Sequence, residues 1–187
     1  DEWLNAYTFP LEARFRNADL ARSVYPNLVS TLLANGTTTA VYFSTIHMEA
    51  SQVLAEVCRD AGQRAFVGKV VMDDPDQCPD YYRDSSTRQA IDETQGFIEF
   101  VRNLSGNDTD LVQPIVTPRF IPSCSHTALL ELGRVADQMD CRVQTHCSEG
   151  DWEHQFVHER YGQSDTAALA ELGLLQRGSV LAHCNFI

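Results

Sequence analysis

Residues suited to chemistry lie at the ends of three short strand-like runs. Arg119 lies near the end of the run 115–120, His146 and Glu149 lie in the run 143–149, and His183 ends the run 180–183. Helix-like stretches separate these runs, so we expect parallel strands whose C-terminal ends gather on one rim, as in a (β/α) barrel. The spacing therefore predicts that an Arg, a Glu and two His side chains converge.

His146 and Glu149 are the candidates for a metal-assisted reaction. A neutral imidazole is the commonest protein ligand for zinc. A carboxylate three residues later, in the following loop, suits proton exchange with a metal-bound water. A core His beside a surface Glu is the commoner reading of one such pair, but the neighbouring strand ends favour a site. His183, which leaves a buried run, could bind metal or polarise a water.

Arg119 and Phe120 are candidates for binding a planar ligand. Arg119 lies in an otherwise uncharged run, and its fixed donors suit a carbonyl or a carboxylate. A salt bridge into the wall of the fold is the alternative, and Phe120 could either stack on a ligand or simply pack. His154 and His158 are four residues apart, but no Glu follows His154 as in a zinc-binding H-E-x-x-H. We interpret that helix as an ordinary exposed face and discount the pair, together with His47 and His126.

Composition bounds the class of protein. The chain has 187 residues, of which 43% are hydrophobic and 21% charged, as in one ordinary globular domain. A net charge of −12 argues against nucleic acid as a partner, and no run approaches the roughly 18 apolar residues of a membrane span. Six cysteines without C-x-x-C spacing indicate reduced thiols and a cytoplasmic protein.

Hydrophobic periodicity predicts an alternation of helices and strands. Helices are expected at 21–33, where Pro26 marks a kink or the first turn, and at 48–61, 86–101, 125–139, 151–160 and 166–172. Strands are expected at 37–44, 64–72, 112–119, 142–146 and 179–183. Residues 73–85 are expected to form a loop, followed by a capping box at Ser86 and Gln89.

This alternation predicts an α/β fold with parallel strands, in about five βα units. A complete eight-stranded barrel takes about 250 residues. The sheet is therefore either open and doubly wound or part of a TIM-type (β/α)8 barrel. The abrupt ends of the sequence favour the partial barrel.

Several motifs resemble those of guanine deaminases, a family of the amidohydrolase superfamily. The stretch N-G-T-T-T at 35–39 is common across the superfamily, whereas three others are more particular to guanine deaminases. These are Y-T-F-P at 7–10, G-Q-R-A-F-V-G-K at 62–69 and P-I-V-T-P-R-F at 114–120. The stretches 3–12, 144–149 and 182–183 add to the resemblance, which covers nearly the whole chain.

The resemblance implies a zinc-dependent enzyme that converts guanine, a small purine base, to xanthine and ammonia. It makes His146 a zinc ligand, Glu149 the proton shuttle and His183 a partner of the activated water. Arg119 and Phe120 would contact the purine, together with His146 and Glu149.

The family's His-x-His zinc pair would lie before Asp1, and its late-strand Asp would lie beyond Ile187. We therefore expect residues 1–187 to be the central part of an amidohydrolase barrel domain, truncated at both ends and inactive alone. A homodimer is the assembly considered. The alternatives are an amidohydrolase acting on a pterin, triazine or nucleoside, and an inactive truncated domain.

Overall fold

The structure is a computed structural model that describes residues 2–186. The chain divides into two compact units. The first comprises Asp1–Val70 and Gln95–Ile115, and the second comprises Val71–Thr94 and Val116–Ile187. Helix α4 (Thr87–Arg102) and the short strand β3 (Val70–Val71) each run from one unit into the other.

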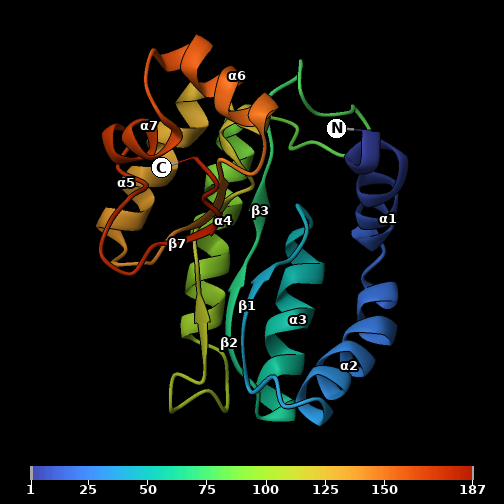
Figure 1. The fold of residues 1–187 in the computed structure, drawn as a ribbon. Helices are drawn as coiled ribbons and strands as arrows, with labels where there is room; N and C mark the ends of the chain where they lie inside the picture. Colours follow the sequence, from blue (N-terminus) through green and yellow to red (C-terminus); the bar gives the residue numbers. More distant parts are fainter. Residues whose placement is uncertain (1, 187) are drawn as a thin grey trace. The chain divides into compact units, whose positions relative to one another are not determined.

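Three parallel strands and two long helices are the main elements of the first unit. Strands β1 (Thr39–Phe43), β2 (Arg64–Gly68) and β4 (Val112–Pro114) form a sheet in the order β1-β2-β4. Helices α2 (Ala18–Ala34) and α3 (Met48–Ala61) pack against each other, and Figure 1 shows α3 running beside β1 and β2. Because the strands are parallel, each connection must cross back, and α3 makes the crossover from β1 to β2.

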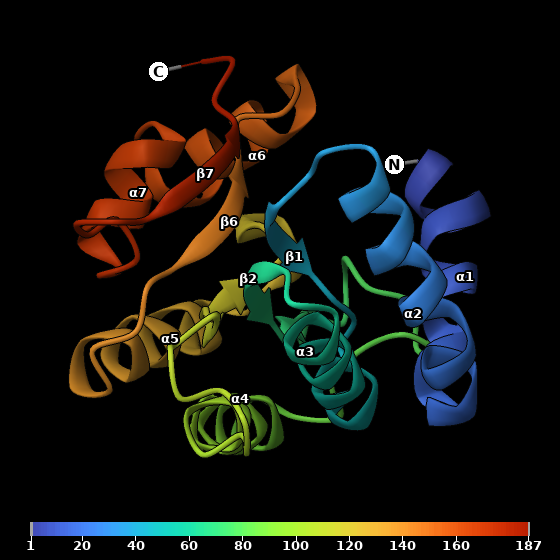
Figure 2. The ribbon, with the colours of Figure 1, turned by 90° about the horizontal axis from the view of Figure 1, so that it is seen from below.

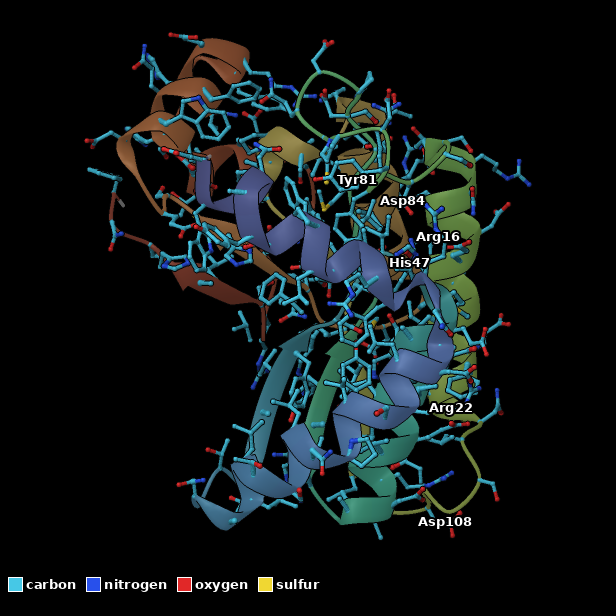
Figure 3. The ribbon with its side chains drawn as sticks, turned by 90° about the vertical axis from the view of Figure 1, so that its right-hand side faces the viewer. Arg16, Arg22, His47, Tyr81, Asp84 and Asp108 are labelled. Carbon is cyan, nitrogen blue, oxygen red and sulfur yellow. The ribbon has the colours of Figure 1, made fainter. Side chains whose placement is uncertain are left out.

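The core of the first unit forms where the apolar face of α3 meets β2, β4 and the end of α4. Val53 and Leu54 of α3 are almost fully buried, as are Val67 and Val112 of the two strands. On the outside of the unit Arg22 of α2, labelled in Figure 3, donates from Nη2 to Oε1 of Glu49 at 3.0 Å. The buried aliphatic and aromatic side chains of this core hold the unit together.

The N-terminal residues are helical, which the sequence did not predict. They form a π-helix (Leu4–Thr8), the helix α1 (Phe9–Ala13) and a 3₁₀-helix (Arg14–Arg16). Asn17 then caps α2, since its side chain accepts the Asp19 amide at 3.0 Å. Pro26 lies inside α2 rather than in its first turn.

The second unit contains β6 (Gln144–Cys147) and β7 (Val180–His183), which pair in parallel. Figure 2 shows these two strands side by side. This unit also contains the short strand β5 (Thr117–Pro118) and a 3₁₀-helix (Ile121–Ser123). Its helices are α5 (His126–Gln138), α6 (Asp151–Tyr161) and α7 (Asp165–Glu171). Buried leucines from α5 and α7, including Leu129 and Leu169, supply its apolar core.

The predicted loop 73–85 is confirmed, and buried carboxylates hold it in place. Asp84, labelled in Figure 3, accepts the Met72 amide through Oδ2 at 2.8 Å, while its own amide donates to the Met72 carbonyl. Asp73 accepts the Ser125 amide and hydroxyl at 2.7 Å each, and also the Thr87 hydroxyl. A segment without regular structure is thus held by charge-assisted hydrogen bonds.

The alternation of helices with parallel strands is confirmed, but two of the five expected strands are wrong as single elements. The run 64–72 divides into β2 and β3, and the run 112–119 divides into β4 and β5. The second division has a clear cause, because the chain changes partner. The Ile115 amide donates to the Val67 carbonyl, whereas the Val116 amide donates to the Arg142 carbonyl. Residues 2–186 form three separate small sheets and no closed barrel.

Two smaller predictions have mixed outcomes. The Ser86 hydroxyl accepts the Gln89 amide at 3.2 Å, as a capping box requires, but the Gln89 side chain pairs with Ser85 and Glu93 instead of returning to Ser86. The six cysteines are free in the structure, and five of them are buried. Across residues 2–186, no helix is long and apolar enough to cross a membrane.

Candidate active site

The ends of β6 and β7 bring two imidazoles together. The parallel register pairs His146 with Ala182 and Cys147 with His183. The rings of His146 and His183 are stacked, with centroids 5.5 Å apart and planes inclined by 22°. Two histidines 37 positions apart in the sequence thus lie side by side because their strands are neighbours.

His146 is held by the backbone of Arg119. The Arg119 carbonyl accepts the His146 amide at 3.0 Å and lies 2.8 Å from Nδ1 of the ring. Because a carbonyl can only accept, Nδ1 carries the proton and Nε2 carries the lone pair. Burial lowers the pKa of His146, an effect that the hydrogen bond to Arg119 opposes. The side chain is therefore a neutral imidazole, the form that binds metals.

Glu149 lies close to His183 and remains open to solvent. Its Oε1 is 3.5 Å from Nε2 of His183, and the two side chains are 57% and 39% exposed. The backbone here is unusual, since Ser148, His183 and Cys184 have φ values of 49°, 75° and 55°. Non-glycine residues rarely adopt this left-handed region, and such strain clusters at functional sites.

Arg119 and Phe120 follow β5 directly, and of the two Arg119 contacts His146. The Arg119 amide donates to the Val71 carbonyl at 3.2 Å, and its Nη1 lies 3.7 Å from the Met72 sulfur. The Phe120 ring lies against Trp152 of α6, with centroids 6.1 Å apart. The structure thus joins Arg119 to His146 through the backbone, while the Phe120 ring contacts an aromatic residue of α6.

Two buried carboxylates beside Glu149 were missed by the sequence analysis. Glu153 of α6 is 3% exposed and Asp165 of α7 is fully buried. Glu153 accepts the Glu149 amide at 2.8 Å, and Asp165 accepts the Ser148 amide at 3.2 Å. Burial, together with the nearby charges of Asp165 and Glu149, raises the pKa of Glu153 to about 7, although the amides of Glu149 and Ser148 act in the opposite direction.

The interpretation of residues 151–160 as an ordinary exposed face is therefore wrong in part. Glu153 and Val157, four residues apart, share a buried face of α6. That spacing was the signal that the sequence offered for Glu153. His154 is paired, since its Nδ1 lies 3.0 Å from Oδ2 of Asp165, whereas His158 is exposed.

The donors present match part of a metal site. Residues 2–186 contain no group of three or more His, Cys, Asp or Glu side chains placed to hold a metal ion. A catalytic zinc normally takes three protein ligands. His146 and His183 have the right donor chemistry, but together they are fewer than a zinc site needs.

The model of the Amidohydrolase family matches this chain over residues 1–187. A guanine deaminase of Dictyostelium discoideum is 41% identical over 185 residues, which are 98% of this chain and 40% of that protein. The guanine deaminase of Mus musculus is 44% identical over 184 residues, which are 97% of this chain and 39% of that protein. The chain thus spans about 40% of the length of these curated relatives.

Solved structures resemble this chain as well. A guanine deaminase from C. acetobutylicum with guanine bound in its active site has a TM-score of 0.90 and 34% identity, covering 97% of this chain and 42% of that one. An adenosine deaminase from Xanthomonas campestris with bound zinc has a TM-score of 0.77 and covers 96% of this chain and 38% of that one. At 23% identity, the second resemblance concerns the fold alone.

Proposed function

Because this chain belongs to the amidohydrolase family, we propose that it is part of a zinc-dependent guanine deaminase, which hydrolyses guanine to xanthine and ammonia. The observation that carries this proposal is the grouping of His146, His183 and Glu149 at the ends of β6 and β7. The relatives that match almost the whole chain at 41% and 44% identity are guanine deaminases, which directs the choice of reaction.

Zinc is proposed on the donor chemistry of His146. Its Nδ1 proton is directed at the Arg119 carbonyl, which leaves Nε2 as the coordinating atom, and the lowered pKa keeps the ring neutral. When bound, zinc would make water a nucleophile near neutral pH. The further ligands would come from the longer protein of which these residues would be the central part, since the relatives are more than twice as long.

Glu149 is proposed as the group that moves protons. Its exposed carboxylate can accept a proton from water and deliver it to a ring nitrogen of the substrate. His183, at 3.5 Å from the same carboxylate, is proposed to orient the attacking water by hydrogen bonding. The two residues would act on the carbon that bears the amine, which departs as ammonia.

Arg119 and Phe120 are proposed to select the base, with His146 and Glu149 as further contacts to it. Guanine presents a carbonyl oxygen that can accept from the Arg119 guanidinium, whereas adenine has an amine at that position. A donor facing a donor in a dry site costs about 1–3 kcal/mol. The Phe120 ring would stack on the planar purine. The Arg119 carbonyl also accepts from His146. Arg119 would therefore both contact the purine and position the proposed zinc ligand.

The test is turnover by the purified full-length protein that contains this chain. Ammonia and xanthine should form from guanine, and the second-order rate constant kcat/KM for adenine, a pterin, a triazine and adenosine should each be lower. Higher turnover of one of these other rings would reassign the substrate. Absence of turnover on all of them, with zinc bound, would favour an inactive domain.

The remaining features are part of the same proposal. Residues 1–187 would supply about five βα units of a TIM-type barrel, and the whole protein would be cytoplasmic and form a homodimer. Sedimentation of the full-length protein would test the dimer.

A further inference from the structure

The loop that carries Glu149 is held through two consecutive backbone amides, those of Ser148 and Glu149. The Ser148 amide donates to Oδ1 of Asp165 at 3.2 Å, and the Glu149 amide donates to Oε2 of Glu153 at 2.8 Å. The two acceptors come from different helices, α7 and α6. One peptide turn is therefore fixed from two directions.

The carbonyl side of the same loop is held as well. The Glu149 carbonyl accepts from Nδ2 of Asn185 at 2.8 Å, and the Ser148 carbonyl accepts the Asn185 amide at 3.0 Å. The Ser148 hydroxyl donates to the Phe186 carbonyl at 3.2 Å. These bonds hold Ser148 at its left-handed φ of 49°, which an unsupported serine would rarely keep.

Helix capping alone does not account for Glu153. A Glu in the first turn of a helix commonly reaches back to an amide, but it does so at the surface, where its charge is solvated. Glu153 is 3% exposed, and its Oε1 has no hydrogen-bond partner among the described residues. A second carboxylate, Asp165, is fully buried beside it. Burying two acidic groups is costly, and an apolar side chain would pack there more cheaply.

We propose that Glu153, supported by Asp165, is a positioning residue that fixes the Glu149 backbone so that the Glu149 carboxylate stays beside His183. This inference rests on the proposed function of Glu149 as the proton-transfer group. The hydrogen bond from Glu153 to the loop is made with the Glu149 amide, so its effect on the reaction passes through Glu149.

The first experiment measures guanine deamination by variants of the full-length protein. Glu153→Leu should lower kcat about 10- to 100-fold, the cost of a small misplacement of a catalytic group, with KM and zinc content little changed. Glu153→Gln should recover most of the rate, because its amide oxygen can still accept the Glu149 amide. Glu159→Leu, an exposed glutamate on the same helix, is the matched control and should leave kcat unchanged.

A double substitution separates positioning from a general structural role. If Glu153 acts through Glu149, adding Glu153→Leu to Glu149→Gln should cause little further loss of rate. Two losses that multiply in the double variant would overturn the inference, as would wild-type kcat in Glu153→Leu.

Hydrogen exchange tests the same contact without reference to the reaction. Glu153→Asp keeps the carboxyl group but shortens the side chain, so the amides of residues 148–150 should exchange faster than in the wild type, while those of β1 should not change. Equal exchange in that segment would overturn the inference, even if Glu153→Leu failed to fold. If the wild-type protein did not deaminate guanine, the proposed function would fail, whereas the exchange result would still decide whether Glu153 holds the loop.

Discussion

The two units of the chain differ in what they bury. Among the described residues of the first unit, the buried polar groups are hydroxyls, amides and one ammonium, those of Ser44, Thr45, Ser51, Gln63, Asn107 and Lys69. The second unit buries four carboxylates, those of Asp73, Asp84, Glu153 and Asp165. Each of these carboxylates accepts at least one backbone amide.

Backbone strain is divided in the same way. In the first unit the described non-glycine residue with positive φ is Asp110, in a turn. In the second unit Asp140 has a positive φ in the turn after α5, and Ser148, His183 and Cys184 have positive φ immediately after β6 or at the end of β7. Three of the four positive-φ residues of the second unit thus lie where its candidate catalytic side chains are, whereas the first unit has no such group of strained residues among those described. This contrast shows where substitutions should affect the reaction and where they should affect stability alone.

The largest expected effect on catalysis is that of substituting Glu149. Glu149→Gln should lower the rate of guanine deamination by the full-length protein at least about 10²-fold, because an amide cannot transfer protons. Zinc content should stay the same, since Glu149 is not a proposed ligand. The control is Glu99→Gln, the same change at an exposed residue of the first unit, which should have no effect on rate. A near-normal rate for Glu149→Gln would exclude the residue from the mechanism. Substitutions in the two units would then no longer be expected to differ in their effect on the reaction.

Glu153 should make stability depend on pH. Its pKa in the folded protein is about 7, above the ordinary carboxyl value of 4.5. The folded state therefore holds the proton more tightly, so this contribution is present below pH 4.5 and is lost as pH rises through 7. The negative charges of the facing groups, Asp165 and Glu149, also raise the pKa of Glu153.

The expected loss is about 3 kcal/mol of unfolding free energy at most, from the size of the shift. Glu153→Gln, which cannot ionise, should lack this component in urea unfolding measured across pH. Parallel pH profiles for wild type and variant would contradict the assignment. Such a result would mean that Glu153 is an ordinary buried residue, and the difference between the two units would be smaller.

Replacing a helical glycine by alanine should change the free energy of unfolding in opposite directions in the two units. A β-carbon at Gly133 of α5 would overlap the Leu172 carbonyl oxygen, so Gly133→Ala should destabilise by about 1–3 kcal/mol. At Gly96 of α4 the nearest atom would be Met48 Cε at 3.7 Å, an ordinary contact, so Gly96→Ala should stabilise by about 0.5–1 kcal/mol. Chemical denaturation measures both, and the same sign for the two would contradict the packing described.

The smallest expected effect on catalysis concerns Arg119. Arg119→Met in the full-length protein should lower kcat/KM for guanine about tenfold, through loss of one charge-assisted hydrogen bond, and leave zinc in place. Arg134→Met, at an exposed Arg of α5 paired with Glu131, is the matched control and should change nothing. Wild-type enzyme that turned over adenine as readily as guanine would contradict the role of Arg119.

Most of the fold was predictable because its signals are local. The helix at 48–61 agrees with α3, whose buried residues include the apolar Ala50, Val53, Leu54 and Cys58. The strands at 142–146 and 179–183 overlap β6 and β7, so the closeness of His146 and His183 followed from parallel pairing alone. The helices before residue 17 were not predicted, because short aromatic turns lack a periodic pattern that distinguishes them from a loop.

The sequence by itself determined which residue types stand at the strand ends and that those strands run parallel, since propensity and periodicity depend on near neighbours. Only the tertiary structure decided which amide meets which acceptor. The change of partner between Ile115 and Val116 depends on carbonyls far away in the chain, those of Val67 and Arg142. The burial of Glu153 and Asp165 likewise depends on α6 and α7 packing against each other. Hydrogen-bond partners and solvent exclusion are properties of assembled elements, and no local pattern encodes them.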